Sequence, residues 1–141
     1  MAATIFVVDD DNLYRRVLVE TLNRAGYEVN NFATGEEALN NVDSPDLLVI
    51  DFYLNSQNRD AMNGIDTIRK ARETNASLPV IVLSGRADLS NSSGNGRLID
   101  LLQQRDSDGL CEAFKEGAYF YLMKNNKTQE SLLGLTRALL S

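Results

Sequence analysis

The chain has 141 residues, a length that suits one domain with a sizeable core. Its 14 Lys and Arg against 20 Asp and Glu give a net charge of −6 at pH 7, which argues against non-specific binding to nucleic acid or to an anionic membrane. The sequence contains no His, which excludes Ser-His-Asp and Cys-His catalysis, His-ligated zinc and a phosphohistidine on this chain.

Five short apolar runs alternate with helix-like patterns along the chain. Three of the runs, IFVV, LLVI and VIVL, are continuously apolar, as expected for parallel strands that are covered on both faces. The predicted strands are Thr4–Val8, Tyr27–Asn31, Asp46–Ile50, Pro79–Leu83 and Ala118–Met123.

The segments between these runs have helical spacing. A first helix is predicted at Asn12–Ala25, where Gly26 supplies a stop, and either Asp11 or Asn12 is expected to cap it. A second is predicted at Thr34–Asn41, because Thr34 and Glu37 stand three residues apart as in a capping box. Further helices are predicted at 65–74, 108–116 and 128–140.

The alternation of strands and helices predicts the α/β class, with a doubly wound (βα)5 arrangement and a five-stranded parallel sheet that has helices on both faces. In such sheets, ligands bind beyond the carboxyl ends of the strands, near the point where the strand order switches. We expect residues 1–141 to form a single domain, with polar insertions near 55–61 and 86–107.

Acidic residues stand at the ends of two predicted strands: Asp9, Asp10 and Asp11 follow the first, and Asp51 follows the third. Carboxylates from neighbouring strand ends would lie close together. Two unit charges about 4 Å apart interact by about 4 kcal/mol at an effective dielectric constant of 20, so such crowding raises carboxyl pKa values or recruits a cation. A cage of oxygen ligands without sulfur or imidazole favours Mg²⁺.

A hydroxyl and a lysine complete this set, because the fourth strand ends near Ser84 and the fifth at Lys124. The combination suggests phosphoryl transfer to Asp51, since a carboxylate can act as a nucleophile and carry an aspartyl phosphate. Mg²⁺ and Lys124 would neutralise the phosphoryl oxygens, and Ser84 would donate a hydrogen bond. Taken singly, a strand-end aspartate is more often a helix cap or a solvated group.

Seven segments carry a resemblance to a known family and cover most of residues 4–124. The chain resembles the receiver domain of bacterial two-component response regulators, the family of the chemotaxis response regulator, and the resemblance implies a flavodoxin-like fold. The segments are VVDDDNLYRR, AGYEV, ATGEEAL, PDLLVIDFYL, MNGID, LPVIVLSG and EAFKEGAYFYLMK.

The resemblance implies a role for each acidic residue of this set. Asp51 would be the phosphoacceptor, and Asp9 and Asp10 would form the acidic pair. Of these two, Asp10 would be the more direct Mg²⁺ ligand, joined by Asp51 and by the backbone carbonyl of Tyr53. The chain would then be a phosphoacceptor with self-limited autodephosphorylation and not a conventional enzyme.

Three further residues match positions of the family that contact the phosphate or take part in switching. Lys124 matches the phosphate-contacting lysine, Ser84 the switch hydroxyl and Tyr121 the switch aromatic. In the family, phosphorylation changes the face made by the fourth helix, the fifth strand and the fifth helix. The resemblance therefore implies a histidine kinase or histidine phosphotransfer protein as donor and a downstream protein target. The insertion near 86–107, beside this face, suggests an unusual partner or a homodimer through it.

The sequence departs from the family pattern at two prolines. The family usually has one shortly after the acceptor strand and one after the lysine, whereas Asn55 follows Leu54 and Asn125 follows Lys124 here. The second departure removes a constraint that helps to aim the lysine. In addition, Tyr53 is bulky where the family's side chain influences the attacking water, which predicts slowed autodephosphorylation.

Three alternative functions compete with that of a phosphorylated receiver. A dehalogenase-like phosphatase requires a second Asp two residues beyond its nucleophile, where this chain has Tyr53, and a flavodoxin-like FMN carrier requires a phosphate loop that three aspartates would repel. The third is a degenerate receiver that acts as a phosphorylation-independent interaction module. Retention of Asp10, Asp51, Ser84 and Lys124 argues against it, while the lost prolines leave it open.

The sequence also carries signals of compartment and output. The single cysteine, Cys111, excludes an internal disulfide, and neither a signal peptide nor an apolar stretch of about 18 residues is visible. We expect a cytoplasmic protein without membrane contact. No helix-turn-helix pattern follows the last predicted helix, so we expect output by protein contact and no direct contact with nucleic acid, unless the chain is part of a longer protein.

Overall fold

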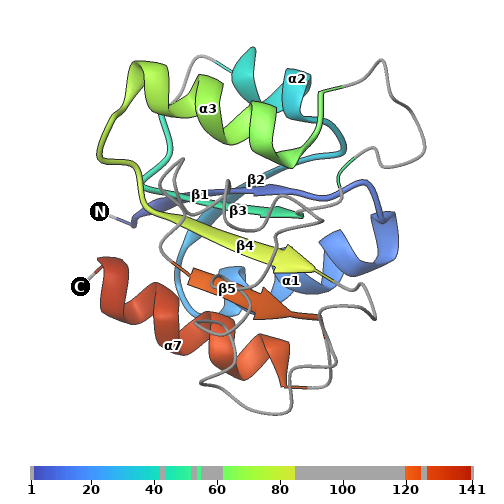
Figure 1. Ribbon diagram of the computed structural model, residues 1–141. Coiled ribbons are helices and arrows are strands. Elements are labelled where there is room, and N and C mark those ends of the chain that lie inside the picture. The colour runs from blue at the N-terminus through green and yellow to red at the C-terminus, as the bar shows by residue number, and fades with distance from the viewer. Residues whose placement is uncertain are drawn as a thin grey trace, which may run out of the picture.

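The computed structural model describes residues 2–41, 44–51, 54, 62–84, 120–124 and 127–140, and these contain a five-stranded parallel sheet in the order β2-β1-β3-β4-β5 (Figure 1). Strand β1 pairs with β2 and β3, and β4 pairs with β3 and β5. The strands are β1 (Thr4–Val8), β2 (Glu28–Phe32), β3 (Leu47–Asp51), β4 (Val80–Ser84) and β5 (Phe120–Met123). The predicted parallel sheet is confirmed.

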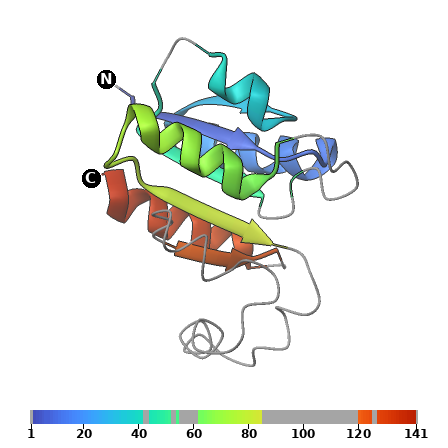
Figure 2. The same cartoon turned by 45° about the horizontal axis from the view of Figure 1, so that its top comes forward.

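Helices cover both faces of this sheet, as the two views in Figure 1 and Figure 2 show. Helices α2 (Gly35–Leu39) and α3 (Gly64–Thr74) lie on one face, and α1 (Asn12–Arg24) and α7 (Thr128–Leu140) lie on the other. The predicted helix at 108–116 and the predicted insertions at 55–61 and 86–107 fall outside the described residues. The doubly wound prediction is confirmed for the described elements.

The alternation of side chains along each strand explains why both faces are covered. In β1, Phe6 and Val8 pack in the cluster beneath α2 and α3, whereas Ile5 and Val7 pack in the cluster against α1 and α7. Successive side chains of a strand point to opposite faces, so a continuously apolar strand requires an apolar partner on each side. This requirement fixes the sheet between two layers of helices and leaves only its strand ends for polar chemistry.

The helix boundaries follow the capping signals of the sequence. Asp11, not Asn12, caps α1, because its Oδ1 accepts hydrogen bonds from the backbone N–H groups of Leu13 and Tyr14 at 3.1 and 3.2 Å. Thr34 caps α2 and accepts from the Glu37 N–H at 3.1 Å. The expected second helix, Thr34–Asn41, is therefore shortened to the residues between its cap and Asn40.

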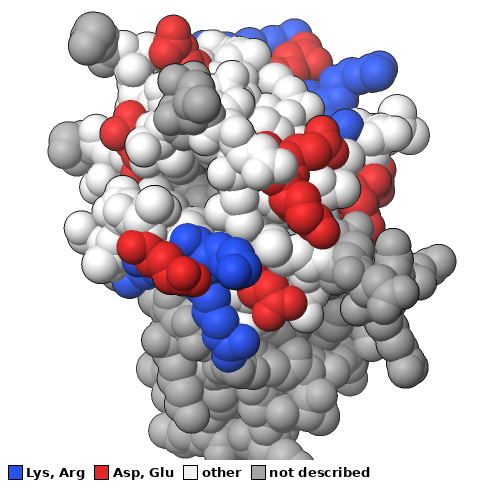
Figure 3. Space-filling model, turned by 90° about the horizontal axis from the view of Figure 1, so that it is seen from above, with Lys and Arg blue, Asp and Glu red and all other residues white. Residues whose placement is uncertain are grey.

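The surface of the α2 and α3 side has both signs of charge. Figure 3 shows Lys and Arg side chains interspersed with Asp and Glu on this side. An interspersed pattern does not produce the basic field that non-specific binding to nucleic acid requires. Among the described residues, no helix is both long enough and apolar enough to cross a membrane.

Two glycines provide a matched test of the packing between α2 and α3. A Cβ on Gly35 would overlap the Thr67 hydroxyl, whereas a Cβ on Gly134 in α7 would meet nothing within 4 Å. We expect Gly35→Ala to lower the free energy of unfolding by about 1–3 kcal/mol. Gly134→Ala should raise it by up to about 1 kcal/mol, because alanine has the higher helix propensity. Urea unfolding measures both, and equal effects would contradict the packing described here.

Candidate functional site

The strand order reverses between β1 and β3. From β1 the chain passes to β2 at the sheet edge and then returns to β3 on the other side of β1. In open parallel sheets, a crevice forms at the carboxyl ends of the two strands on either side of such a reversal. Asp9 directly follows β1, and Asp51 is the last residue of β3, so both lie at this crevice.

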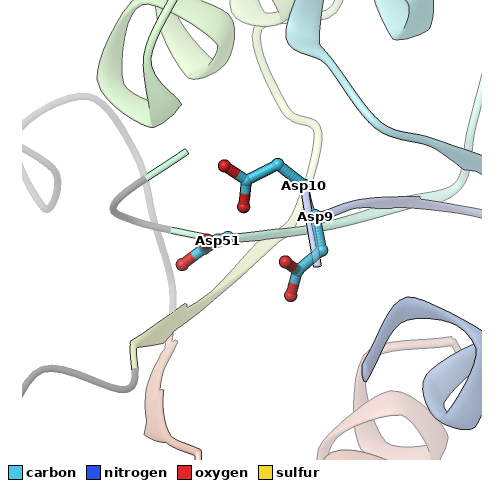
Figure 4. A group of neighbouring side chains, drawn as sticks. All are labelled: Asp9, Asp10 and Asp51. Carbon is cyan, nitrogen blue, oxygen red and sulfur yellow. The ribbon is translucent and has the colours of Figure 1, made fainter. Parts of the chain in front are cut away.

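Three carboxylates meet at the crevice. One carboxylate oxygen from each of Asp9, Asp10 and Asp51 lies within 4.8 Å of the other two, and Figure 4 shows the three side chains close together. Asp9 and Asp51 are only 1% and 6% exposed, whereas Asp10 is exposed to solvent. The strand ends thus gather carboxylates as the sequence predicts, and burial distinguishes the roles open to them.

Lys124 reaches these carboxylates from the end of β5. Its Nζ lies 2.8 Å from Asp9 Oδ2 and 3.7 Å from Asp51 Oδ1. Burial disfavours the charged amine, but the hydrogen bond to Asp9 and the charges of Asp51 and Asp9 outweigh burial, so the pKa of Lys124 is raised above its usual value. Lys124 is therefore a cation at neutral pH, held between two carboxylates.

The two oxygens of Asp9 have different partners within the protein. Oδ2 accepts from Lys124, while Oδ1 accepts from the backbone N–H of Asp11 at 2.9 Å. A buried carboxylate requires such partners, because its desolvation costs several kcal/mol without them. Asp9 therefore orders the loop between β1 and α1 and holds the lysine, whereas Asp10 in the same loop is accessible to a ligand from solvent.

The remaining site residues of the sequence analysis are placed only in part. Ser84 is the last residue of β4, where its backbone pairs with Met123, and Tyr121 lies in β5 opposite Val82. The side chains of Ser84 and Tyr121 lie outside the described part of the structure, as does the whole of Tyr53. The backbone register nevertheless sets Ser84 beside the residue that precedes Lys124.

Comparison with known proteins identifies the family. Residues 5–95 match the response regulator receiver domain. The chain belongs to this family. The response regulator MprA of Mycobacterium tuberculosis (strain ATCC 25618 / H37Rv) is 36% identical over 92 residues, which cover 64% of this chain and 38% of MprA. The DNA-binding transcriptional regulator NtrC of Escherichia coli (strain K12) is 28% identical over 137 residues, which cover 96% of this chain and 24% of NtrC.

Solved structures support the same assignment over almost the whole chain. The BeF3-activated DrrB receiver domain superposes with a TM-score of 0.73 and 26% identity, covering 99% of this chain and 98% of DrrB. A putative response regulator from Chloroflexus aurantiacus J-10-fl gives a TM-score of 0.72 and 27% identity, covering both chains completely. The receiver domain described here thus spans well under two thirds of the curated relatives MprA and NtrC but matches whole receiver structures.

Sequence reasoning missed one residue that shapes the acidic loop of this receiver domain. The Arg15 guanidinium donates to the Asp9 carbonyl at 2.6 Å, to Asn31 Oδ1 at 2.9 Å and to Asn12 Oδ1 at 2.7 Å. It thereby ties the peptide between Asp9 and Asp10 to α1 and to β2. The only sequence signal was the RR pair in VVDDDNLYRR, and that pair does not reveal which arginine turns inward.

Arg15 and its neighbour Arg16 allow a controlled test of this tie. Arg15→Met removes three hydrogen bonds from a charged donor, so the free energy of unfolding should fall by about 2 kcal/mol. Arg16 is exposed, and Arg16→Met should change stability by no more than about 0.5 kcal/mol. Urea unfolding compares the two variants. Equal stabilities would show that the arginine does not hold the loop.

Proposed function

We propose that this receiver domain accepts a phosphoryl group on Asp51 from a phosphohistidine of a partner protein, and that phosphorylation switches a protein-interaction surface. One observation carries the proposal: the Asp51 carboxylate lies at the switch point beside the carboxylates of Asp9 and Asp10 and 3.7 Å from the Lys124 ammonium. A carboxylate at a strand end can act as the nucleophile in phosphoryl transfer, and a cation beside it can pair with the negative oxygens of the phosphoryl group.

The donor atoms of the site fit Mg²⁺. All three carboxylates supply oxygen, the chain has no His, and Mg²⁺ typically uses one or two carboxylates together with water. By resemblance to the family, Asp10 and Asp51 would be the direct ligands, and Asp10 is exposed to solvent. The backbone carbonyl of Tyr53 would be a third, by resemblance to the family. Bound Mg²⁺ would offset the negative charge of the phosphoryl oxygens.

In the proposed reaction, three residues would have separate roles: Asp51, Lys124 and Ser84. An Asp51 carboxylate oxygen bonds to phosphorus as the bond from phosphorus to the donor histidine nitrogen breaks. The Lys124 ammonium, already 3.7 Å from Asp51, pairs with an oxygen of the incoming group while it stays bound to Asp9. Ser84, at the end of the strand between those of Asp51 and Lys124, would donate a hydrogen bond to a second oxygen.

The proposed partners follow from the same chemistry. Since this sequence contains no His, the phosphohistidine belongs to a histidine kinase or histidine phosphotransfer protein. We place the output on the face that includes β5 and α7, through Ser84 and Tyr121, where a downstream protein or a second copy of the chain would bind. The domain would act in the cytoplasm as a phosphoacceptor with self-limited autodephosphorylation and not as a conventional enzyme.

We also take residues 1–141 to be one receiver domain. Strand β5 and helix α7 lie beyond residues 5–95, the part that matches the family, but β5 belongs to the same sheet as β1 to β4. Leu132 of α7 is fully buried in the cluster that also contains Ile5 and Val7 of β1. This shared core supports one unit in which the carboxyl-terminal elements complete the site through Lys124.

Phosphorylation of Asp51 has a direct test, with a control aspartate just before the same strand. With Mg²⁺ and acetyl phosphate, intact-mass spectrometry should detect one added phosphoryl group, and Asp51→Asn should abolish it. Asp46 is an exposed aspartate just before β3, at the opposite end from Asp51, so Asp46→Asn should be modified like the wild type. An unmodified wild-type protein would favour the phosphorylation-independent interaction module instead.

The proposed difference between Asp10 and Asp11 in Mg²⁺ binding has a test that does not involve phosphorylation. Asp10→Asn removes one ligand charge and should weaken Mg²⁺ binding by about tenfold or more, because a carboxylate and a divalent cation about 4 Å apart interact by about 2 kcal/mol even in water. Asp11→Asn keeps the helix cap, since Asn caps as well as Asp, and should bind Mg²⁺ like the wild type. Titration calorimetry measures both, and equal affinities would remove Asp10 from the site.

A further inference from the structure

Lys124 has a third contact besides its two carboxylates. Its Nζ lies over the face of the Tyr14 ring, 4.6 Å from the ring centroid. The ammonium is thus bounded by Asp9 at 2.8 Å, by Asp51 at 3.7 Å and by an aromatic face. An aromatic ring attracts a cation above its face through the electric quadrupole of the ring, within about 6 Å of the centroid. The distance observed here is within that range.

The Tyr14 ring is itself held in place by α1 and the core. Its backbone N–H donates to the capping Asp11 side chain at 3.2 Å, which fixes the first turn of α1. The side chain packs against the buried cluster that contains Leu18 and Leu132, and its hydroxyl oxygen is buried. This burial raises the pKa of the Tyr14 phenol, against the opposing effects of Thr128 and Lys124, so the ring remains neutral at pH 7.

A restraint on Lys124 matters because a lysine side chain is long and flexible. It carries a point charge on a four-carbon stem, and its rotamers compete with any single position of the ammonium. Asn125 follows Lys124, so the chain lacks the ring constraint that a proline would impose at that position. Asp9 alone fixes the distance of the ammonium from one oxygen but not its direction. The face of the Tyr14 ring blocks movement of the Lys124 ammonium in one direction.

We propose that Tyr14 is a positioning residue for Lys124: its ring face keeps the ammonium between Asp9 and Asp51, where it meets the incoming phosphoryl group. The inference rests on the proposed phosphoryl transfer for its consequence, but the position of Lys124 can be measured without that reaction. The aromatic face carries this role, and the hydroxyl does not. Phenylalanine should therefore replace Tyr14, and an aliphatic residue should not.

The first experiment measures how well Lys124 is held. The protein is treated with an amine-acylating reagent at limiting dose, and labelling of Lys124 is compared with labelling of the exposed Lys70 by peptide mass spectrometry. Tyr14→Leu should increase the relative labelling of Lys124 by about 2- to 30-fold, the range that corresponds to a contact of about 0.5–2 kcal/mol. Tyr14→Phe should leave it unchanged.

Two further variants separate positioning from packing. Tyr27 packs in the same cluster as Tyr14, so Tyr27→Leu removes a comparable ring and should not change Lys124 labelling. Tyr14→Met fills the space with an unbranched side chain and should behave like Tyr14→Leu, which preserves the test if the leucine variant folds poorly. Equal labelling in Tyr14→Phe and Tyr14→Leu, or increased labelling in Tyr27→Leu, would overturn the proposal.

The second experiment connects this position to the reaction. With Mg²⁺ and acetyl phosphate, Tyr14→Leu should acquire the phosphoryl group about 2- to 30-fold more slowly than the wild type, and Tyr14→Phe at the wild-type rate. An increase in Lys124 labelling without a change in the phosphorylation rate would overturn the positioning role of Tyr14. If the wild type itself is not phosphorylated, the proposed function fails, while the labelling result still decides whether Tyr14 holds Lys124.

Discussion

The ion pair between Lys124 and Asp9 is the interaction on which the rest of the site depends. Asp9 is almost fully buried, and a buried carboxylate without partners would cost several kcal/mol. Lys124 and the Asp11 N–H provide those partners. Because Lys124 follows β5 and Asp9 follows β1, this one contact joins strands that are separated in the sheet by β3 and β4. It therefore makes the carboxyl-terminal part of the chain necessary for the acidic site, and it sets Asp51, at the end of β3, beside a cation.

The same pair gives a physical route from the site to a surface. Lys124 lies 2.8 Å from Asp9 and 3.7 Å from Asp51, so its contact with Asp51 is the longer one and would shorten if the charge on Asp51 increased. In the proposed reaction, the aspartyl phosphate carries more negative charge than the free Asp51 carboxylate, so the attraction on Lys124 would increase. Lys124 continues directly from β5, and β5 packs with α7 and β4. A change in the attraction on Lys124 would thus act on backbone that forms part of the proposed output face.

The parts of the fold that could be predicted are those in which local pattern and tertiary structure agree. The apolar run TIFVV gave β1 with its bounds, because a strand buried on both faces leaves no position for polar residues. The choice between Asp11 and Asn12 required the hydrogen bonds themselves, since both residue types cap helices well.

Arg15 and Tyr14 were missed for a different reason: Arg15 acts through a backbone carbonyl, and Tyr14 contacts a lysine 110 positions away in the sequence. Neither contact leaves a periodicity or a spacing to detect, and both become visible only when the strand order is known.

The carboxylates of Asp9, Asp10 and Asp51 look alike in the sequence but differ in burial, and their burial suits them to different roles. Asp9 is the most buried and uses both oxygens to organise the protein, so it is poorly suited to a ligand that comes and goes. Asp10 is exposed, so it can bind or release a cation without leaving an unpaired charge in the protein interior. Asp51 lies between these extremes, at 6% exposed, and a nucleophile requires this balance. A phosphoryl donor would have to reach Asp51, yet an aspartyl phosphate formed there would be hydrolysed more slowly where water has little access. The exposure of the three groups therefore matches their proposed roles: the most buried, Asp9, organises the protein, Asp51 would receive the phosphoryl group, and the exposed Asp10 would bind the cation.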